Sequence, residues 1–189
     1  MFIDKLLGLI IGVLFLLVLS CDGPTDASSE KNITLQQKRT LKNDVAFWDY
    51  AASSNMLQTE IGQLVLERGE SPAIQALAQK AVSFHSEALS ELNTIAKQYK
   101  VPIMPDSLIG ADSDLVKQFE LLKGEELTKR YKAFIASTHK NQLTRYEEAL
   151  GKADDQKTRD WLMKMVVHLQ EELEQLSKVD SLQGKSNSK

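Results

Sequence analysis

The sequence contains few of the residues that interrupt helices, and few that carry redox or metal chemistry. Nine Gly and four Pro in 189 residues are too few for the many turns of a β-sandwich or a β-barrel. A single Cys excludes an internal disulfide, and only three His are present. The contents of 42% hydrophobic and 26% charged residues exclude a disordered chain and a polytopic membrane protein. One domain built from long helices is therefore expected.

The longest apolar run covers residues 6–19. It is shorter than the ~20 residues that a membrane-spanning helix needs, and it has the length of the hydrophobic region of a signal peptide. The run ends at Val18, Leu19, Ser20 and Cys21, which resembles the lipobox of bacterial lipoproteins. This resemblance implies that residues 1–20 are a lipoprotein signal peptide and that Cys21 is the lipid-modified first residue of the mature protein. The alternative is a signal peptide beside an incidental Cys.

A lipidated Cys21 would leave no thiol for a disulfide, a metal thiolate or a nucleophile. Two or more acyl chains would hold the domain stably on a membrane of the bacterial cell envelope, facing the periplasm or the cell surface. The membrane is therefore one expected partner, through the N-terminal lipid, and an envelope protein is a candidate second partner. A net charge of −3 without a basic stripe argues against nucleic acid.

Composition also separates the ends of the mature chain from its centre. Residues 21–42 are polar and lack periodicity, which predicts a flexible tether after the lipidated Cys. Residues 180–189 have a similar composition and are predicted to form a disordered tail. The folded domain is therefore expected at residues 43–179.

Four long segments of this domain have helical periodicity. Asn43 and Gly69 are the expected caps of the first helix, and Ser71 followed by Pro72 predicts the start of the second. The first three predicted long helices cover residues 44–68, 72–99 and 125–150, with a short extra helix at 114–123 in the linker. The fourth is capped by Asp154 or Asp155 and runs to about residue 179. The first helix is expected to bury a stripe made of Ala46, Tyr50, Ser53, Leu57, Ile61 and Leu64. The fold class predicted is all-α, an antiparallel four-helix bundle.

Several short motifs occur in an order that is similar to that of a known family. They are Asp44–Phe47 followed by Ala51 and Ala52, the run Glu60–Leu64, Ser71-Pro72, His85, Tyr131 eight residues before His139, and His168. Over residues 44–176 the chain resembles the ferritin-like envelope proteins of the domain-of-unknown-function 4142 family, often labelled "predicted outer membrane protein". The resemblance implies a ferritin-like bundle in the envelope, without an established activity.

Three positions depart from the pattern of this family. Phe84 stands where the family usually has Asp, Gln58 where it often has Glu, and Met163 where it usually has Pro. The missing carboxylate beside His85 removes a candidate hydrogen-bond partner for a metal-bound imidazole.

The three His residues are expected to lie in one layer in the middle of the bundle. His139 and His168 lie at similar distances from the turn between their helices, and His85 is the midpoint of its helix. By helical angle, His85 and His139 point inward and His168 lies at the edge of its apolar stripe. Because neutral imidazole is a good ligand for transition metals, the candidate metal ligands are His85, His139 and His168, with Glu60 from the first helix.

The same residues also fit interpretations without a metal. Each His can be a core or boundary residue that is hydrogen-bonded to a Tyr, Ser, Thr or carboxylate. A ferritin-type di-iron site needs two Glu-x-x-His motifs, but the residues three before the His are Val82, Ala136 and Met165. Glu171 and Glu172 are interpreted as part of a solvated face. No Gly-rich phosphate loop or serine-hydrolase motif is present.

Two functional hypotheses remain. The first is a lipid-anchored, non-enzymatic module that binds a partner in the envelope or stabilises an assembly. The alternative is a mononuclear transition-metal or haem site formed by His85 and His139, with His168 or Glu60. The sequence favours the first hypothesis, because a core or boundary role for the three His residues needs no cofactor.

Overall fold

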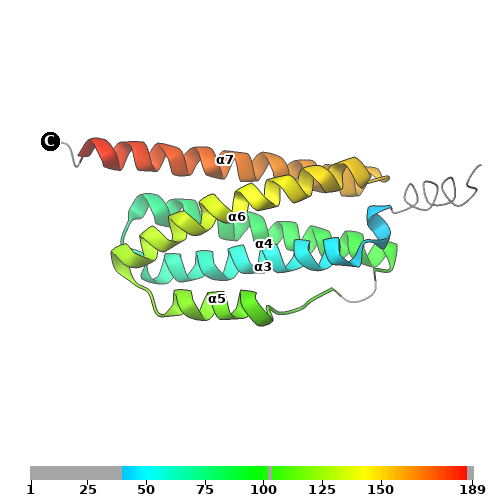
Figure 1. Cartoon of the computed structure of the whole chain (residues 1–189), viewed down its shortest axis with the longest axis horizontal. Coiled ribbons are helices and arrows are strands. Elements are labelled where there is room, and N and C mark those ends of the chain that lie inside the picture. The colour runs from blue at the N-terminus through cyan, green and yellow to red at the C-terminus, as the bar shows by residue number, and fades with distance from the viewer. Residues whose placement is uncertain (1–39, 102–103, 187–189) are drawn as a thin grey trace, which may run out of the picture. The chain divides into compact units, whose positions relative to one another are not determined.

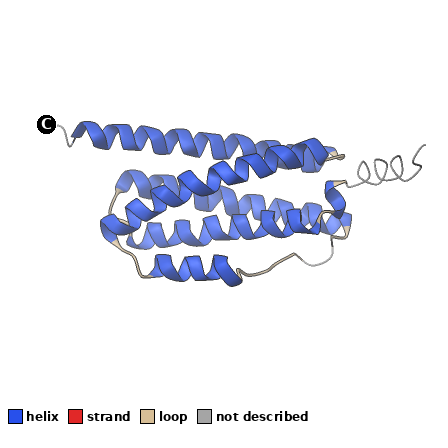
Figure 2. Cartoon of the chain, viewed as in Figure 1, coloured by secondary structure: helices blue, strands red, loops and turns tan. Residues whose placement is uncertain are grey.

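The computed structural model describes residues 40–101 and 104–186, with side chains up to residue 182. Within these residues the chain forms a 3₁₀ turn and five α-helices, and no strand (Figure 2). The prediction of an all-α chain is thus confirmed. The signal peptide predicted at residues 1–20, with most of the tether predicted at 21–42, lies outside the described residues. None of the described helices combines the length and the apolar character needed to cross a membrane.

The helices follow one another along the chain as four long elements and one short one (Figure 1). They are the 3₁₀ turn Leu41–Asn43, α3 Val45–Arg68, α4 Pro72–Tyr99, α5 Gly110–Glu120, α6 Gly124–Lys152 and α7 Gln156–Ser186. Helix α3 packs against α4, α6 packs against α7, and α4 also contacts α7. The short helix α5 lies along α3, on the side away from α7 (Figure 1).

Several helix ends lie where the start and stop signals predicted them. Gly69 is the C-cap of α3, and α4 begins at Pro72 after Ser71. The Phe47 amide donates to the Asp44 carboxylate over 3.2 Å, so Asp44 and not the expected Asn43 is the N-cap of α3. Asn43 is unavailable for this role because it belongs to the preceding 3₁₀ turn.

Other boundaries differ from the prediction by a few residues. Helix α6 continues through Gly151 to Lys152, because Ala153 is buried and its amide still bonds to the Ala149 carbonyl over 2.9 Å. Helix α7 extends to Ser186, so residues 180–186 are helical where a disordered tail was predicted. An ion pair between Lys132 of α6 and Asp180 holds this extension to the rest of the fold.

Packed residues occur before the predicted domain boundary at residue 43. Leu41 is buried, and its carbonyl accepts a hydrogen bond of 3.1 Å from the indole of Trp48. The turn that contains Leu41 therefore closes one end of the helical core.

The face of α3 that turns inward was predicted only in part: Leu57 and Ile61 are buried as expected, but the rest of the predicted stripe is not. Ala46 is exposed, and Tyr50, Ser53 and Leu64 are only partly buried. The buried residues are Phe47, Trp48, Ala51, Ala52, Ser54, Asn55, Met56, Leu57, Gln58, Ile61, Gly62 and Val65. Asn55 and Gln58 on this face are polar, so the apolar pattern alone does not identify it.

The apolar core consists of two clusters at different heights along the helices. The first surrounds Trp48, Tyr146 and Trp161. The second surrounds Ile61 and Tyr131. At the second cluster, α3 and α4 approach each other closely at Gly62, where a Cβ atom would lie 2.8 Å from the Cγ2 atom of Val82. The polar buried residues described below lie in the layer between the two clusters.

Loss of the N-cap of α7 is expected to destabilise the fold in a pH-dependent way. The Asp155 carboxylate accepts a bond of 2.9 Å from the Thr158 amide. Burial alone would raise the pKa of Asp155, but hydrogen bonds from Tyr99 and Thr158 outweigh it and lower this pKa. Asp155→Ala should therefore reduce the free energy of unfolding by about 1 kcal/mol at neutral pH.

This stabilisation requires the ionised carboxylate, because the folded-state pKa of Asp155 lies below that of the unfolded chain. It is fully present above the unfolded-state pKa and should be lost as the pH falls from about 5 towards 3 and below. Urea unfolding at several pH values measures the difference, with the exposed neighbour change Asp154→Ala as the control. A difference that stays constant across this pH range would contradict the prediction.

Candidate functional site

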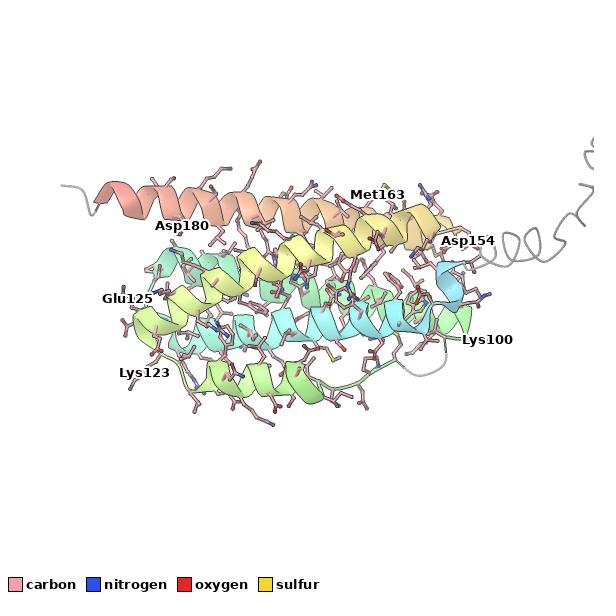
Figure 3. All side chains as sticks on the ribbon, viewed as in Figure 1. Lys100, Lys123, Glu125, Asp154, Met163 and Asp180 are labelled. Atoms are coloured by element: carbon pink, nitrogen blue, oxygen red, sulfur yellow. The ribbon has the colours of Figure 1, made fainter. Side chains whose placement is uncertain are left out.

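A layer of buried polar side chains lies between the two apolar clusters, and all four long helices contribute to it. Side chains from these helices fill the interior at this level (Figure 3). The buried members are Asn55 and Gln58 of α3, His85 of α4, His139 and Gln142 of α6, and Glu172 of α7. Burying so many polar groups in one layer is costly unless they bind one another or a ligand.

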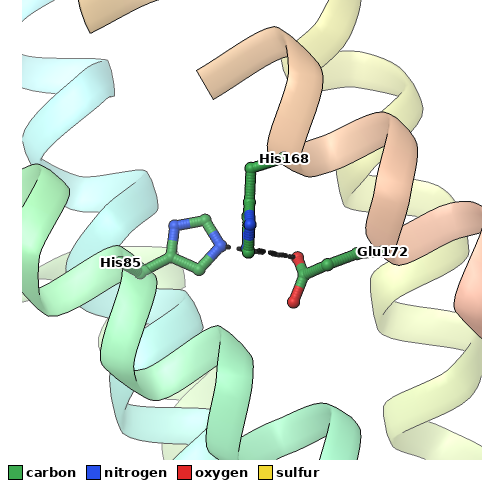
Figure 4. Close-up of side chains that lie close together, drawn as sticks. All are labelled: His85, His168 and Glu172. Carbon is green, nitrogen blue, oxygen red and sulfur yellow. Dashed lines mark ion pairs between the residues drawn. The ribbon is translucent and has the colours of Figure 1, made fainter. Parts of the chain in front are cut away.

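Two of these side chains, His85 and Glu172, and the partly exposed His168 of α7 point their ligand atoms at one another (Figure 4). One nitrogen each from His85 and His168 and one carboxylate oxygen of Glu172 all lie within 4.8 Å of one another. The Glu172 Oε2 atom is 3.7 Å from the Nε2 atom of His85 and 3.4 Å from that of His168. His85 and Glu172 are fully enclosed, whereas His168 is 15% exposed. These residues form the candidate metal centre.

The third imidazole, that of His139, holds the carboxylate in place. Its Nε2 atom lies 2.5 Å from the Oε2 atom of Glu172, and both side chains are buried. His139 is absent from the group of mutually close ligand atoms formed by His85, His168 and Glu172. Its role in this geometry is therefore to orient Glu172 from the side of α6.

Asn55 orients His85. The Asn55 side-chain amide donates to the Ala51 carbonyl over 2.7 Å, which leaves its Oδ1 atom as an acceptor 2.9 Å from the Nδ1 atom of His85. The proton of His85 therefore resides on Nδ1, and the lone pair of Nε2 faces His168 and Glu172. A hydrogen bond to the non-ligating nitrogen is the usual means of fixing a metal-binding imidazole.

Three buried atoms of the centre have no hydrogen-bond partner among the described residues. They are His85 Nε2, His168 Nε2 and Glu172 Oε1. Natural proteins satisfy the large majority of their buried polar atoms, so three orphaned atoms in one cluster require an explanation. Two imidazole nitrogens and one carboxylate oxygen are the donor set of many zinc and non-haem iron sites. The residues present therefore fit a transition-metal ion.

The protonation states also suit a metal ligand set. Burial lowers the pKa of His85 below its usual value, which favours the neutral imidazole that binds metals. Burial would raise the pKa of Glu172, but the hydrogen bond with His139 and the nearby imidazoles of His168 and His85 outweigh it and hold this pKa far below its usual range. Glu172 is therefore an ionised carboxylate at neutral pH.

Phe84 covers the side of the centre that is nearest to solvent. Its ring stacks on the imidazole of His168, with 3.4 Å between the ring centroids and 9° between the planes. The Lys164 ammonium lies 5.7 Å from the Phe84 ring centroid and pairs with Glu87 and Glu91 of α4. The most exposed member of the candidate centre is therefore His168, which lies between α4 and α7 against the Phe84 ring.

The structure brings together the three His residues that the sequence placed in one layer. His85 and His139 point inward and His168 lies at the edge, as their helical angles predicted. Glu60 is not part of the centre, because its side chain is exposed on the surface. Partial desolvation of its carboxyl group and the nearby charge of Glu120 raise its pKa. The carboxylate of the centre is Glu172.

The interpretation of Glu172 as part of a solvated face was wrong, whereas Glu171 is exposed as expected. The spacing contained a usable signal. Glu172 follows His168 by four residues and so lies on the same side of the helix, in line with the buried Leu169 and Leu176. Asn55 was missed because the buried face of α3 was assigned incorrectly.

Comparison with known proteins places the chain in a family. Residues 29–179 match the family described as Domain of unknown function (DUF4142), so the chain belongs to this family. The match spans most of the sequence, and its first residues precede the described part.

One solved structure is similar in fold, and its title reads "Crystal structure of DUF305 fragment from Deinococcus radiodurans". It is 14% identical, with a TM-score of 0.61, and the alignment covers 71% of this chain and 93% of that one. At this identity the likeness concerns the fold alone. No curated protein matches the sequence.

Removal of the Asn55 amide is expected to change the tautomer of His85 and the stability of the protein even when no metal is bound. Asn55→Ala would leave the buried Nδ1–H group of His85 without its acceptor, which should cost about 1–3 kcal/mol of unfolding free energy in metal-free protein. The nitrogen chemical shifts of His85 should change from the Nδ1–H tautomer to a mixture. Urea unfolding and NMR measure the two effects. The exposed change Asn141→Ala is the control, and an Asn55→Ala protein with the stability and tautomer of the original chain would contradict this role.

Proposed function

We propose that this protein binds a single transition-metal ion through His85, His168 and Glu172, with His139 orienting the carboxylate. The observation that carries the proposal is the convergence of two buried imidazole nitrogens without hydrogen-bond partners, His85 Nε2 and His168 Nε2, on the carboxylate of Glu172, whose Oε1 atom also has no partner among the described residues. A divalent cation would accept their lone pairs and compensate the buried negative charge of Glu172. When bound, the ion would supply a Lewis-acidic centre with room in its coordination sphere for a further ligand.

The ligand set differs from the one proposed on sequence grounds. His85 and His168 are retained, His139 becomes an orienting residue, and Glu172 replaces Glu60. A haem is a poorer match for this centre, because the space around His85 is filled by the imidazoles and the Phe84 ring within 5.4–6.3 Å of its ring centroid.

The proposed role is binding and not catalysis. Two ligands are completely enclosed and the third is covered by Phe84, which leaves little access for an organic substrate. The two Glu-x-x-His motifs of the di-iron oxidases are also missing from the sequence. Such a site fits three functions: metal storage, metal transfer, or metal-dependent stability of an envelope assembly. In each of them the protein could act together with another protein of the envelope.

We further propose that the four long helices form an antiparallel four-helix bundle of the ferritin-like type. Short connections at 69–71 and 153–155 join α3 to α4 and α6 to α7, which favours antiparallel neighbours. The longer connection from α4 to α6 contains α5 and is long enough to run the length of the bundle. A ligand site made from inward side chains of facing helices is typical of such bundles.

The proposed location is the bacterial cell envelope, with the domain anchored to a membrane by lipid on Cys21. The support is the signal-peptide pattern of residues 1–20 and the lipobox-like sequence before Cys21. In this setting the metal centre would lie outside the cytosol, and nucleic acid would not be a partner.

Metal binding should depend on Glu172 and much less on its exposed neighbour. Protein purified without a His tag is expected to bind about one Zn²⁺ or Co²⁺ per chain, as a three-residue ligand set allows. Glu172→Gln should weaken binding by more than the ~10–100-fold that loss of an orienting residue causes, because it removes a direct ligand. His139→Gln should fall within that ~10–100-fold range.

Elemental analysis and competition with a chromophoric chelator measure these affinities. Glu171→Gln is the matched control, since Glu171 is adjacent but exposed. Equal affinities for Glu172→Gln and the unchanged protein would contradict the ligand assignment. Absence of bound metal, with a double variant His85→Ala/His168→Ala that is only less stable, would instead identify the cluster as a structural hydrogen-bond network.

The lipid anchor is tested by a single substitution in the full chain. Cys21→Ala should release the protein from bacterial membranes and stop its labelling by a radioactive fatty acid, because the acceptor sulfur is lost. Ser28→Ala, in the same segment, is the control and should change neither readout. Retention of Cys21→Ala on membranes without label would contradict the proposed anchor.

A further inference from the structure

A second candidate site lies outside the metal centre, in a groove between α3 and α6. The groove has a volume of about 920 Å³ and is lined by residues of these two helices together with Leu41, Asp44 and Asp112, the last of them from α5. This volume is within the range of small-molecule sites, which is roughly 300–1,000 Å³. None of the proposed metal ligands lines the groove.

Gln142 provides an unused acceptor in this groove. Its side chain lines the groove, the residue is only 4% exposed, and its Oε1 atom has no hydrogen-bond partner in the described part of the chain. The neighbouring Thr138 hydroxyl, which also lines the groove, is already engaged: it donates to the Phe134 carbonyl and accepts from the Gln58 amide. The free carbonyl oxygen of Gln142 is therefore suited to an N–H donor of a ligand.

Arg145 provides a cation that is already held in position. The guanidinium carbon lies 4.2 Å from the centroid of the Tyr50 ring, across the groove. Arg145 forms no ion pair with any residue that the structure describes, although Asp49 and Glu148 line the same groove. Stacking fixes the plane of the guanidinium and leaves its N–H edges for a bidentate bond to a carboxylate.

Carboxylates provide the complementary charge. Asp49, Asp112 and Glu148 line the groove and have no ion-pair partner among the described residues. Burial raises the pKa of Tyr50, a hydrogen bond with Ser54 and the charge of Arg145 lower it, and the charge of Asp112 raises it, so charges of both signs act on the same phenol. Opposite charges that share a groove without pairing are complementary to a ligand that carries both charges itself.

We propose that the α3–α6 groove binds a small zwitterion of the size of a short peptide. Its carboxylate would bind the Arg145 guanidinium, and its ammonium group would lie between Asp112 and the Gln142 carbonyl oxygen. The volume exceeds that of one amino acid, which favours a peptide with both ends free. This proposal does not depend on the metal centre, although Gln142 is one helical turn from His139.

The test uses metal-free protein, so that it is independent of the proposed metal function. Isothermal titration calorimetry is carried out with trialanine in four forms: free, N-acetylated, C-amidated and blocked at both ends. The free form should bind, and blocking either end should weaken binding at least ~10-fold, since each block removes a charge-assisted hydrogen bond. Arg145→Gln should weaken binding of the free form to a similar extent, and Arg145→Lys should restore it only in part.

Arg130→Gln is the matched control, because Arg130 lies on the same helix, 5.9 Å from the Phe119 ring centroid, and does not line the groove. It should bind free trialanine like the unchanged protein. Thermal unfolding establishes that both variants are folded. The proposal would be overturned if free trialanine does not bind at millimolar concentration, or if all four forms bind equally. It would also be overturned if only the free and C-amidated forms bind, with equal affinity, because the carboxylate would then play no part. Equal losses in Arg145→Gln and Arg130→Gln would overturn it as well.

Discussion

The interior of this protein is organised around one ionised carboxylate, that of Glu172, which is buried among three imidazoles. A charge at this depth is tolerated only where partners compensate it, and His139 at 2.5 Å is the nearest of them. The partners come from α4, α6 and α7, so burial of Glu172 sets the relative heights of three helices. Asn55 extends the network to α3 through its bond to His85. The contacts of Glu172, extended by Asn55, thus connect all four long helices in one layer.

The apolar clusters on either side of this layer strengthen the interactions between its polar groups. Trp48, Tyr146 and Trp161 exclude water from one side, and Ile61 and Tyr131 exclude it from the other. Electrostatic interactions are much stronger in such surroundings than in water, and unsatisfied atoms there are correspondingly costly. Because Nε2 of His85 and Oε1 of Glu172 remain unsatisfied, a bound cation would stabilise the layer more than it would at an exposed site.

Prediction from the sequence succeeded where local rules are strong. Ser71 followed by Pro72 specifies a helix start, and the regular apolar stripe of α4 identifies His85 as an inward residue. The shared layer of the His residues could be predicted because the rise per residue is constant along a helix. Prediction failed on α3, where Asn55 and Gln58 occupy buried positions and partly exposed Tyr50 and Leu64 mimic a core stripe. It failed again at Glu172, because an acidic residue in an acidic helix is exposed far more often than it is buried.

The sequence by itself determined the all-α character, most helix boundaries, the family and the convergence of three His residues on one level. Each of these follows from short-range rules, namely capping, periodicity and helical rise, or from the order of motifs along the chain. Only the tertiary structure decided that Glu172 and not Glu60 faces the imidazoles, and that Asn55 orients His85. These outcomes depend on how each helix is rotated about its axis. That rotation is set by packing against the neighbouring helices, and on α3 the apolar pattern does not reveal it because Asn55 and Gln58 lie on the buried face.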